Sequence, residues 1–181
     1  MRGPPTELRP RGARSKRPKG RQASAAKARL VVGWREWVSL PDFGIEAIKA
    51  KIDTGARTSV VHADDVVFVR RGRVRYVRFT IHPTQRSSRG AIRTIAKLVG
   101  HRRVRSSNGV SEKRPVVRTT LKVGEVSWPI ELTLTSRDHM GFRMLVGRMA
   151  LVRHALVDPS ASYRTRKPPA KKRRKKKGPA K

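Results

Sequence analysis

The sequence predicts an all-β domain: a small closed or partly closed β-barrel with one short carboxy-terminal helix and disordered basic tails. From residue 30 onward the apolar residues form short runs rich in Val, Ile, Leu and Thr, separated by Gly, Pro and Asn, as in strands and turns. Several runs alternate apolar and polar residues, as half-buried antiparallel strands do. Helical character is scarce, and a barrel is a common solution for such a chain.

The apolar runs define the expected elements in order. We expect strands at residues 31–40, 45–52, 66–69, 74–81, 91–98, 116–123, 126–134 and 144–146. Alternation is clearest in 74–81 and 130–134, and residues 122–126 have the pattern of a hairpin turn. The one expected helix follows Gly147, covers residues 149–154 and makes about two turns.

A second hairpin is expected around residues 100–112. A strongly basic stretch at 102–105 precedes Asn108-Gly109, a dipeptide typical of tight hairpin turns. The hairpin is either an ordinary surface feature or a flap that covers a site, and turn chemistry leaves both open.

Charge divides the chain into three parts. Residues 1–29 hold ten basic residues and one acid, and residues 164–181 hold eleven basic residues and no acid. Low hydrophobicity with high net charge predicts that both tails are disordered. Residues 30–163 carry 24 basic and 11 acidic side chains, a net charge of 24 − 11 = +13, and form the single expected domain.

The formal net charge of +33 predicts attraction to polyanions: nucleic acid, an anionic membrane or an acidic polypeptide. The tails fit nonspecific contact with nucleic acid, and equally a solubilising role. The chain has no cysteine, which excludes disulfides, thiolate nucleophiles and Cys-type zinc sites. No apolar stretch approaches the ~20 residues that span a bilayer, so we expect a cytoplasmic protein without membrane contact.

One short motif has the composition of a catalytic loop. Asp53 ends an apolar strand and is followed by Thr54 and Gly55, a hydroxyl and a residue that permits a tight turn. Ordinary turns use the same residues, so the motif alone is weak evidence. About 90 residues later, however, an apolar run at 144–146 ends in Gly147-Arg148.

The two motifs together resemble a retropepsin-like aspartic peptidase. The likeness covers about residues 31–163. Within the family, the flanking residues are most similar to a bacterial branch labelled putative ATP-dependent zinc protease, which is associated with ATP-grasp ligases that add glutamates to protein tails. The segments that carry it are Ala50-Lys51-Ile52-Asp53-Thr54-Gly55-Ala56-Arg57-Thr58-Ser59 and residues 105–109, 112–117, 128–135 and 142–148.

The resemblance implies an aspartic mechanism, in which two carboxylates share one proton. One chain holds only one such motif, so we expect a homodimer in which Asp53 meets Asp53 of its partner at a twofold axis. The resemblance also implies that Thr54 buttresses the loop, that Gly55 allows close approach of substrate, and that Gly147 and Arg148 support the loop.

One position departs from the viral members of the family, which have an acid two residues after the Gly where this chain has Arg57. That acid pairs with the Arg of the Gly-Arg motif, so Arg57 or Arg148 is left to bind a substrate carboxylate. The predicted substrate-binding residues are Ala56, Arg57, Arg103, Arg105 and Arg114; the alternative for each arginine is an ordinary surface residue.

The sequence contains no motif for binding the zinc or the ATP that this label names. The chain has neither His-Glu-x-x-His nor a Gly-x-x-x-x-Gly-Lys-Ser/Thr loop. Its five histidines are scattered, and Asp64-Asp65 lack the Thr-Gly turn and are expected to be helix-cap or loop acids. We therefore predict no metal and no cofactor.

The leading hypothesis is a homodimeric aspartic endopeptidase that trims acidic, glutamate-rich segments such as polyglutamylated tails. The rival is a non-catalytic module of the same fold whose basic tails bind RNA or ribosomal surfaces. Only nine residues are aromatic, and Trp34, Trp37 and Trp128 lie in strand patterns, so stacking platforms for single-stranded RNA are not evident.

Overall fold

The computed structural model describes residues 28–85, 87, 89–105, 109–136 and 141–165. Eleven strands dominate this part of the chain, together with the 3-10 turn η1 (Pro41–Phe43) and the one-turn helix α1 (Arg148–Leu151). The strands are β1 (Leu30–Gly33), β2 (Arg35–Leu40), β3 (Ile45–Asp53), β4 (Ser59–His62), β5 (Asp64–Arg71), β6 (Val74–Ile81), β7 (Ile92–Arg105), β8 (Ser111–Val123), β9 (Val126–Thr135), β10 (Met144–Gly147) and β11 (Ala155–Asp158).

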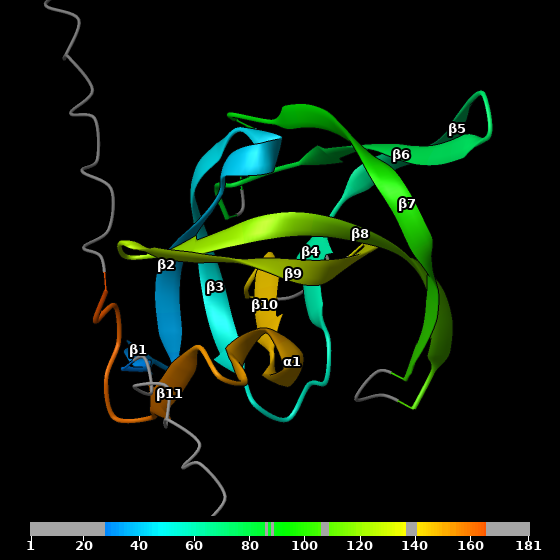
Figure 1. Cartoon of the computed structure of the whole chain (residues 1–181). Helices are drawn as coiled ribbons and strands as arrows, with labels where there is room; N and C mark the ends of the chain where they lie inside the picture. Colours follow the sequence, from blue (N-terminus) through cyan, green and yellow to red (C-terminus); the bar gives the residue numbers. More distant parts are fainter. Residues whose placement is uncertain (1–27, 86, 88, 106–108, 137–140, 166–181) are drawn as a thin grey trace, which may run out of the picture.

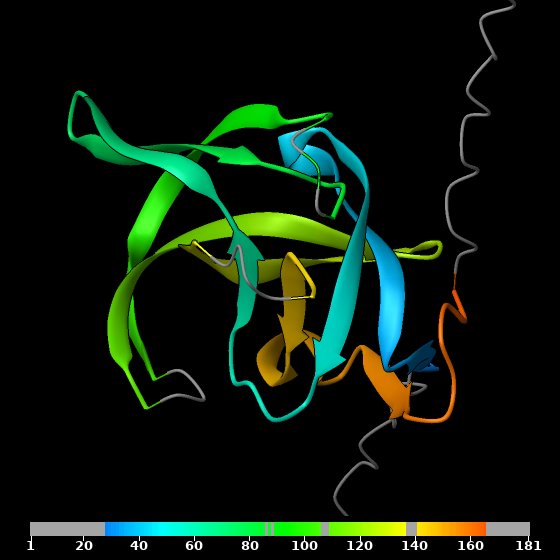
Figure 2. The same ribbon diagram turned by 180° about the vertical axis from the view of Figure 1, so that it is seen from behind.

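Nine of these strands form one sheet that bends back on itself (Figures 1 and 2). Its order is β2-β3-β10-β4-β9-β8-β7-β6-β5, and a further pairing of β2 with β8 closes the first six strands into a ring. β5, β6 and β7 continue beyond the ring as an antiparallel extension. The predicted all-β, partly closed barrel with one short helix is therefore confirmed.

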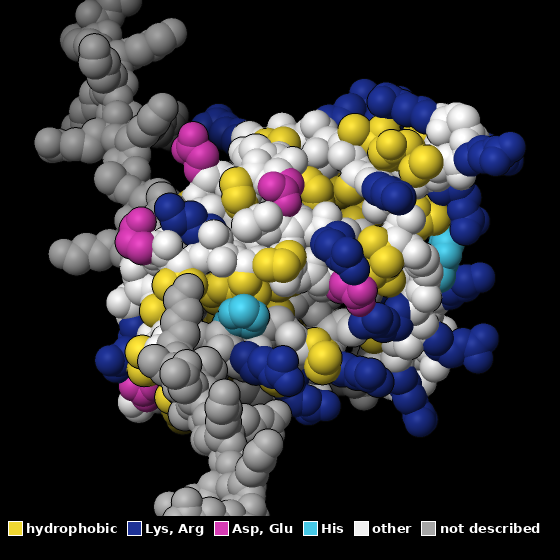
Figure 3. All heavy atoms as spheres, in the orientation of Figure 1, with side chains coloured by type: hydrophobic (Ala, Val, Ile, Leu, Met, Phe, Trp, Pro, Cys, Tyr) yellow, Lys and Arg dark blue, Asp and Glu magenta, His cyan; other side chains and the backbone are white. Residues whose placement is uncertain are grey.

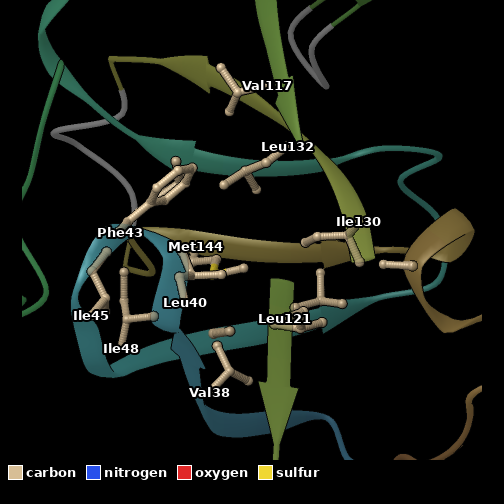
Figure 4. Close-up of a cluster of buried hydrophobic side chains, with 14 of the residues drawn as sticks. Val38, Leu40, Phe43, Ile45, Ile48, Val117, Leu121, Ile130, Leu132 and Met144 are labelled. Carbon is tan, nitrogen blue, oxygen red and sulfur yellow. The ribbon is translucent and has the colours of Figure 1, made fainter. Parts of the chain in front are cut away.

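The core fills the ring between its walls (Figure 4). Alternate residues of β3 point inward, and Ile48, Ala50 and Ile52 are buried there. β9 supplies Leu132 and Leu134, and β10 supplies Met144 from the strand that crosses between β3 and β4. Because apolar burial is the main favourable contribution to folding, this interior fixes the position of the short strands β4 and β10.

The amino-terminal run that predicts a single strand at 31–40 is in fact two strands, which corrects that prediction. The chain turns at Trp34, whose N–H donates to the Ala161 carbonyl (2.9 Å) instead of continuing the ladder. β1 then pairs in parallel with β11, while β2 pairs with β3. A Cβ on Gly33 would lie 2.4 Å from the Ala161 oxygen, so only glycine allows this close approach.

The predicted helix 149–154 is also too long. α1 ends at Leu151, because Val152 takes an extended conformation and Arg153 has a positive φ of 70°. β11 begins directly afterwards and, like β4, was not predicted. Both missed strands have only four residues, too few for an alternating pattern to be visible in the sequence.

A buried carboxylate holds the last described residues, which end at Thr165. Glu36 is fully buried on β2, and its carboxylate accepts hydrogen bonds from the backbone N–H groups of Gly33, Arg164 and Thr165 and from the Thr165 hydroxyl. This carboxylate holds the end of the described chain against the barrel. Residues 1–27 and 166–181, the bulk of the two predicted tails, lie outside the described residues.

Among the residues that the structure describes, no helix is long and apolar enough to cross a membrane.

Candidate active site

Asp53 lies at the last position of β3, opposite Gly147 in the parallel pairing of β3 with β10. After it, residues 54–58 form an open loop that returns into β4. β10 is hydrogen-bonded to β3 on one side and to β4 on the other, so it occupies the space between the two strands that carry the loop. Two segments about 90 residues apart in the sequence therefore meet at Asp53, as the two motifs predict.

The carboxylate of Asp53 is held by its own loop. Oδ1 accepts hydrogen bonds from the N–H groups of Gly55 (3.2 Å) and Ala56 (3.1 Å). The side chain is 27% exposed, and Oδ2 lies 3.9 Å from Nζ of Lys51, two residues earlier on the same face of β3. The loop amides thus orient one oxygen, while the carboxylate as a whole remains reachable from solvent. Lys51 was missed at the sequence level, although its position two residues before Asp53 on a strand places it on the same face.

The Gly147-Arg148 segment contacts the loop at four points. The Gly147 N–H donates to Ser59 Oγ (3.1 Å), and the Arg148 N–H donates to the Ala56 carbonyl (2.7 Å). Nη1 of Arg148 donates to the Thr54 carbonyl (3.1 Å). In addition, the Gly147 Cα faces the Thr58 backbone so closely that a Cβ would lie 2.5 Å from the Thr58 carbonyl carbon. These contacts fix the backbone on both sides of Gly55.

The Thr54 side chain and the Cβ position of Gly55 make no comparable contacts within the described residues. The Thr54 hydroxyl makes no hydrogen bond to any residue that the structure describes, and both residues are exposed. A Cβ on Gly55 would meet only Asp53 Oδ1, at 3.4 Å. Within one chain Thr54 supports the loop through its carbonyl, which accepts a hydrogen bond from Arg148.

Three of the four predicted substrate arginines lie on the β7–β8 hairpin, and the fourth, Arg57, lies in the loop after Asp53. Arg57 is in the loop that follows Asp53, where its carbonyl accepts a hydrogen bond from the Met149 N–H (3.1 Å). Arg103 and Arg105 are exposed on β7, in the hairpin with β8, and Nε of Arg105 donates to the Gly109 carbonyl. Arg114 is only 8% exposed and donates to Glu112 (2.6 Å). Of the four, only Arg57 adjoins the Asp53 loop along the chain.

The hairpin predicted around residues 100–112 is present as the long pair β7–β8, with Arg105 opposite Ser111. Its end lies at the same end of the molecule as the Asp53 loop (Figures 1 and 2). Gly109 has a positive φ of 80°, as a turn requires. Asn108 and the rest of the tip, 106–108, are outside the described residues, so the flap hypothesis stays a prediction.

Two of the five histidines meet, contrary to their scattered positions in the sequence. Oδ2 of Asp64 lies 3.2 Å from Nε2 of the buried His62 and 3.1 Å from Nε2 of His82. Asp64 and Asp65 are in strand β5, at a bulge against β6, and are not the helix-cap or loop acids that were expected. Within the described ranges no group of three or more His, Asp or Glu side chains is arranged to hold a metal ion.

Comparison with known proteins places this geometry in a family. Residues 31–168 match the RimB-like family model, described as retropepsin-like aspartic endopeptidase RimB. A solved protein of unknown function from Legionella pneumophila, Lpg0085 (DUF785), is 27% identical, with a TM-score of 0.64 over 77% of this chain and 100% of that protein.

Curated relatives are named probable alpha-L-glutamate ligase. Those from Parasynechococcus marenigrum and Shewanella pealeana are 47% and 44% identical over 135 residues, or 75% of this chain. The match covers 29% and 30% of their lengths, so this chain spans less than a third of each relative. The resemblance inferred from the two motifs is confirmed: the chain belongs to the RimB-like family of retropepsin-like domains.

Proposed function

We propose that this protein is an aspartic endopeptidase that works as a homodimer, with Asp53 of each chain forming the catalytic dyad, and that it cleaves acidic, glutamate-rich segments of proteins. The observation that supports this most is the Asp53 loop itself. The loop presents a carboxylate that solvent can reach, and two loop amides orient its Oδ1. Gly147 and Arg148 fix the backbone of the loop.

In the proposed reaction the ionised carboxylate of the dyad takes a proton from a water molecule as its oxygen bonds to the scissile carbonyl carbon. The protonated carboxyl of the other chain donates a hydrogen bond to the carbonyl oxygen, where negative charge develops. The tetrahedral intermediate then collapses: the C–N bond breaks, and the leaving nitrogen takes a proton from the dyad. Two carboxyl groups are required, and each chain supplies one.

A dimer is supported by the apolar side chains at the same end of the molecule. Val152, directly after α1, is 49% exposed. Val31 and Leu156 are cross-strand neighbours in the β1–β11 pair, and both are exposed. These elements lie near the carboxyl end of β3 (Figure 1). A twofold contact in this region would cover these three side chains and bring two Asp53 loops toward each other.

An acidic substrate is supported by charge and by kinship. The described barrel is strongly basic, and Lys and Arg side chains outnumber acids over the face in Figure 3. The family relatives named as glutamate ligases carry a domain like this one, which links the domain to proteins that handle glutamate. We therefore propose that the substrate is a glutamate-bearing segment, including a polyglutamylated tail. We also propose that the protein is cytoplasmic.

The proposed function is tested with purified wild type and Asp53→Asn on a glutamate-tailed peptide and a neutral peptide of equal length. We expect wild type to cleave the acidic peptide in the presence of a chelator and Asp53→Asn to cleave neither. Equal cleavage by both proteins would refute the dyad, and cleavage that a chelator abolishes would require a metal.

Polyanion binding is a second candidate, favoured by one observation. Residues 66–111 contain twelve Lys and Arg residues and no acid, and most of them lie on β5, β6 and β7. With the two basic tails, this surface would bind RNA backbone through phosphate contacts. Such binding falls steeply with salt concentration. Salt-sensitive retention of RNA without any peptide hydrolysis would favour this function over the first.

A further inference from the structure

A hollow of about 280 Å³ lies beside the Asp53 loop. Its walls come from three parts of the fold: residues 57–59 of the loop, residues 129–131 of β9 and residues 149–150 of α1. Arg102 of β7 forms the remaining side. The hollow is therefore bounded by both the candidate catalytic loop and the β7–β8 hairpin.

The charged side chains of the hollow leave one positive charge unbalanced. Nη2 of Arg102 donates to Oε2 of Glu131 at 2.8 Å, so these two charges of the lining compensate each other. Nη2 of Arg118, which is not part of the lining, lies 3.9 Å from Oε1 of the same carboxylate. Arg57 is the third charged residue of the lining, and its guanidinium makes no hydrogen bond or ion pair with any residue in the described part of the chain. One additional carboxylate would therefore neutralise the lining.

The rest of the lining is mixed. Pro129, Ile130, Met149 and Ala150 are its apolar residues, and Thr58 and Ser59 carry hydroxyl groups. A glutamate side chain offers a partner both to the apolar residues and to a guanidinium, since two methylene groups precede its carboxylate. Burial of the methylenes against carbon and bidentate binding of the carboxylate by a guanidinium are both favourable.

Arg57 is fixed close to the reacting carboxylate. Its carbonyl is held by the Met149 N–H, and the carbonyl of Ala56 is held by the Arg148 N–H. Two residues of extended chain span at most about 7 Å, so the Cα atoms of Gly55 and Arg57 are no farther apart than that. A substrate strand rises ~3.3 Å per residue, so a side chain two or three residues from the scissile bond reaches the hollow.

We propose that this hollow is a subsite for one glutamate side chain of the substrate, whose carboxylate is bound by Arg57. Arg102 forms the opposite wall and is held there by Glu131, which also keeps the hollow from carrying two unbalanced cations. This inference rests on the proposed peptidase function, because it places the subsite beside the scissile bond. The proposed subsite differs from a general attraction of acidic peptides to the basic surface, since it makes the preference for Glu depend on Arg57.

The test measures binding without turnover, in an Asp53→Asn background. The probes are a peptide of alternating Glu and Ser with a neutral fluorophore and its counterpart with Gln in place of Glu, measured by anisotropy in about 150 mM salt. We expect Arg57→Gln to weaken binding of the Glu peptide about tenfold and to leave the Gln peptide unchanged, because one charge-assisted contact is lost. Arg57→Lys should retain part of the preference, and Arg57→Glu should shift it toward a Lys-containing peptide.

Arg75→Gln is the matched control, because it removes the same charge from an exposed position on β6. Equal weakening by Arg57→Gln and Arg75→Gln would overturn the subsite in favour of overall charge. The subsite would also be overturned if Arg57→Gln kept the preference for the Glu peptide. The same holds if the variant lost binding together with its oligomeric state, as measured by native mass analysis.

Failure of the subsite and failure of the peptidase function give different results. If wild type cleaves no peptide but binding of the Glu peptide depends on Arg57, the peptidase function fails and the subsite stands. If wild type cleaves the acidic peptide and Arg57→Gln keeps the same ratio of kcat/KM for Glu and Gln peptides, the subsite fails and the peptidase function stands.

Discussion

Gly147 and Thr58 approach each other so closely that no side chain fits between them. A Cβ on Gly147 would lie 2.5 Å from the Thr58 carbonyl carbon, 2.6 Å from its oxygen and 2.9 Å from the Ser59 nitrogen. All three atoms belong to the backbone of the chain that leaves the Asp53 loop, so they cannot rotate away. The glycine of the second motif therefore determines how near β10 comes to the candidate catalytic loop.

Replacing this glycine should cost both stability and activity. We expect Gly147→Ala to lower the free energy of unfolding by about 1–3 kcal/mol, as overpacking does in a tightly packed interior. Chemical denaturation measures the change. Gly141→Ala is the control, since nothing lies within 4 Å of its Cβ position, and it should change stability by less than about 0.5 kcal/mol. Equal effects of the two substitutions would contradict the account of Gly147.

Arg148 should act on the loop more than on the fold. Its exposed guanidinium donates to the Thr54 carbonyl through Nη1. Arg148→Gln removes this hydrogen bond, which borders Gly55. We expect kcat for the acidic peptide to fall about tenfold with a smaller change in KM, because the loop that carries Asp53 is less well fixed. A variant with normal kcat and raised KM would instead assign Arg148 to substrate binding.

The buried Glu36 carboxylate should contribute strongly to stability. Three backbone N–H groups and one hydroxyl donate to it. In Glu36→Gln one oxygen becomes an NH₂ group that faces donors, so buried polar groups lose their partners. We expect a loss of about 1–3 kcal/mol, measured by thermal and denaturant unfolding. Glu125→Gln, whose side chain is 96% exposed, should leave the midpoint unchanged, and a similar loss there would contradict the anchoring role.

Asp158 gives a pH-dependent prediction. Hydrogen bonds from the Ser160 hydroxyl and N–H hold the pKa of Asp158 below its ordinary value of 3.8; desolvation opposes them, and the charge of Arg164 and its hydrogen bond lower the pKa further. A lowered folded-state pKa stabilises the protein above the unfolded-state pKa, and the contribution is lost as pH falls through the folded-state pKa. Asp158→Asn should therefore be less stable than wild type at pH 7 and equally stable at the lowest pH.

The measurement for Asp158 is the difference in unfolding midpoint between wild type and Asp158→Asn across pH. A difference that stays constant from neutral to strongly acidic pH would show that the substitution acts through packing or turn geometry and not through the charge.

The sequence predicts the barrel because its long strands have visible alternation. β6 has eight residues and β9 has ten, and each buries one face or both. The hairpin turns between the long strands contain Gly. β4 and β11 have four residues each and are defined only by their partners, so no local pattern distinguishes them. The break at Trp34 likewise depends on Ala161, which lies far away in the sequence.

Local motifs point to part of the candidate site, but not to the side chains that converge from distant strands. Asp53 and Gly147-Arg148 belong to two local motifs, which the family resemblance links. The approach of Arg102 to the Asp53 loop depends on how the β7–β8 hairpin curves, and the meeting of His62 with His82 depends on the β5–β6 extension. Neither arrangement has a sequence spacing that would reveal it.

The central claim is that each active site needs an Asp53 from two chains. The most direct measurement mixes wild type with Asp53→Asn in equal amounts, unfolds and refolds them together, and compares peptide cleavage with that of wild type alone at the same total protein concentration. If random dimers form and only those with two intact carboxylates are active, about a quarter of the activity remains. Retention of half the activity would show that each chain works alone and would contradict the dyad.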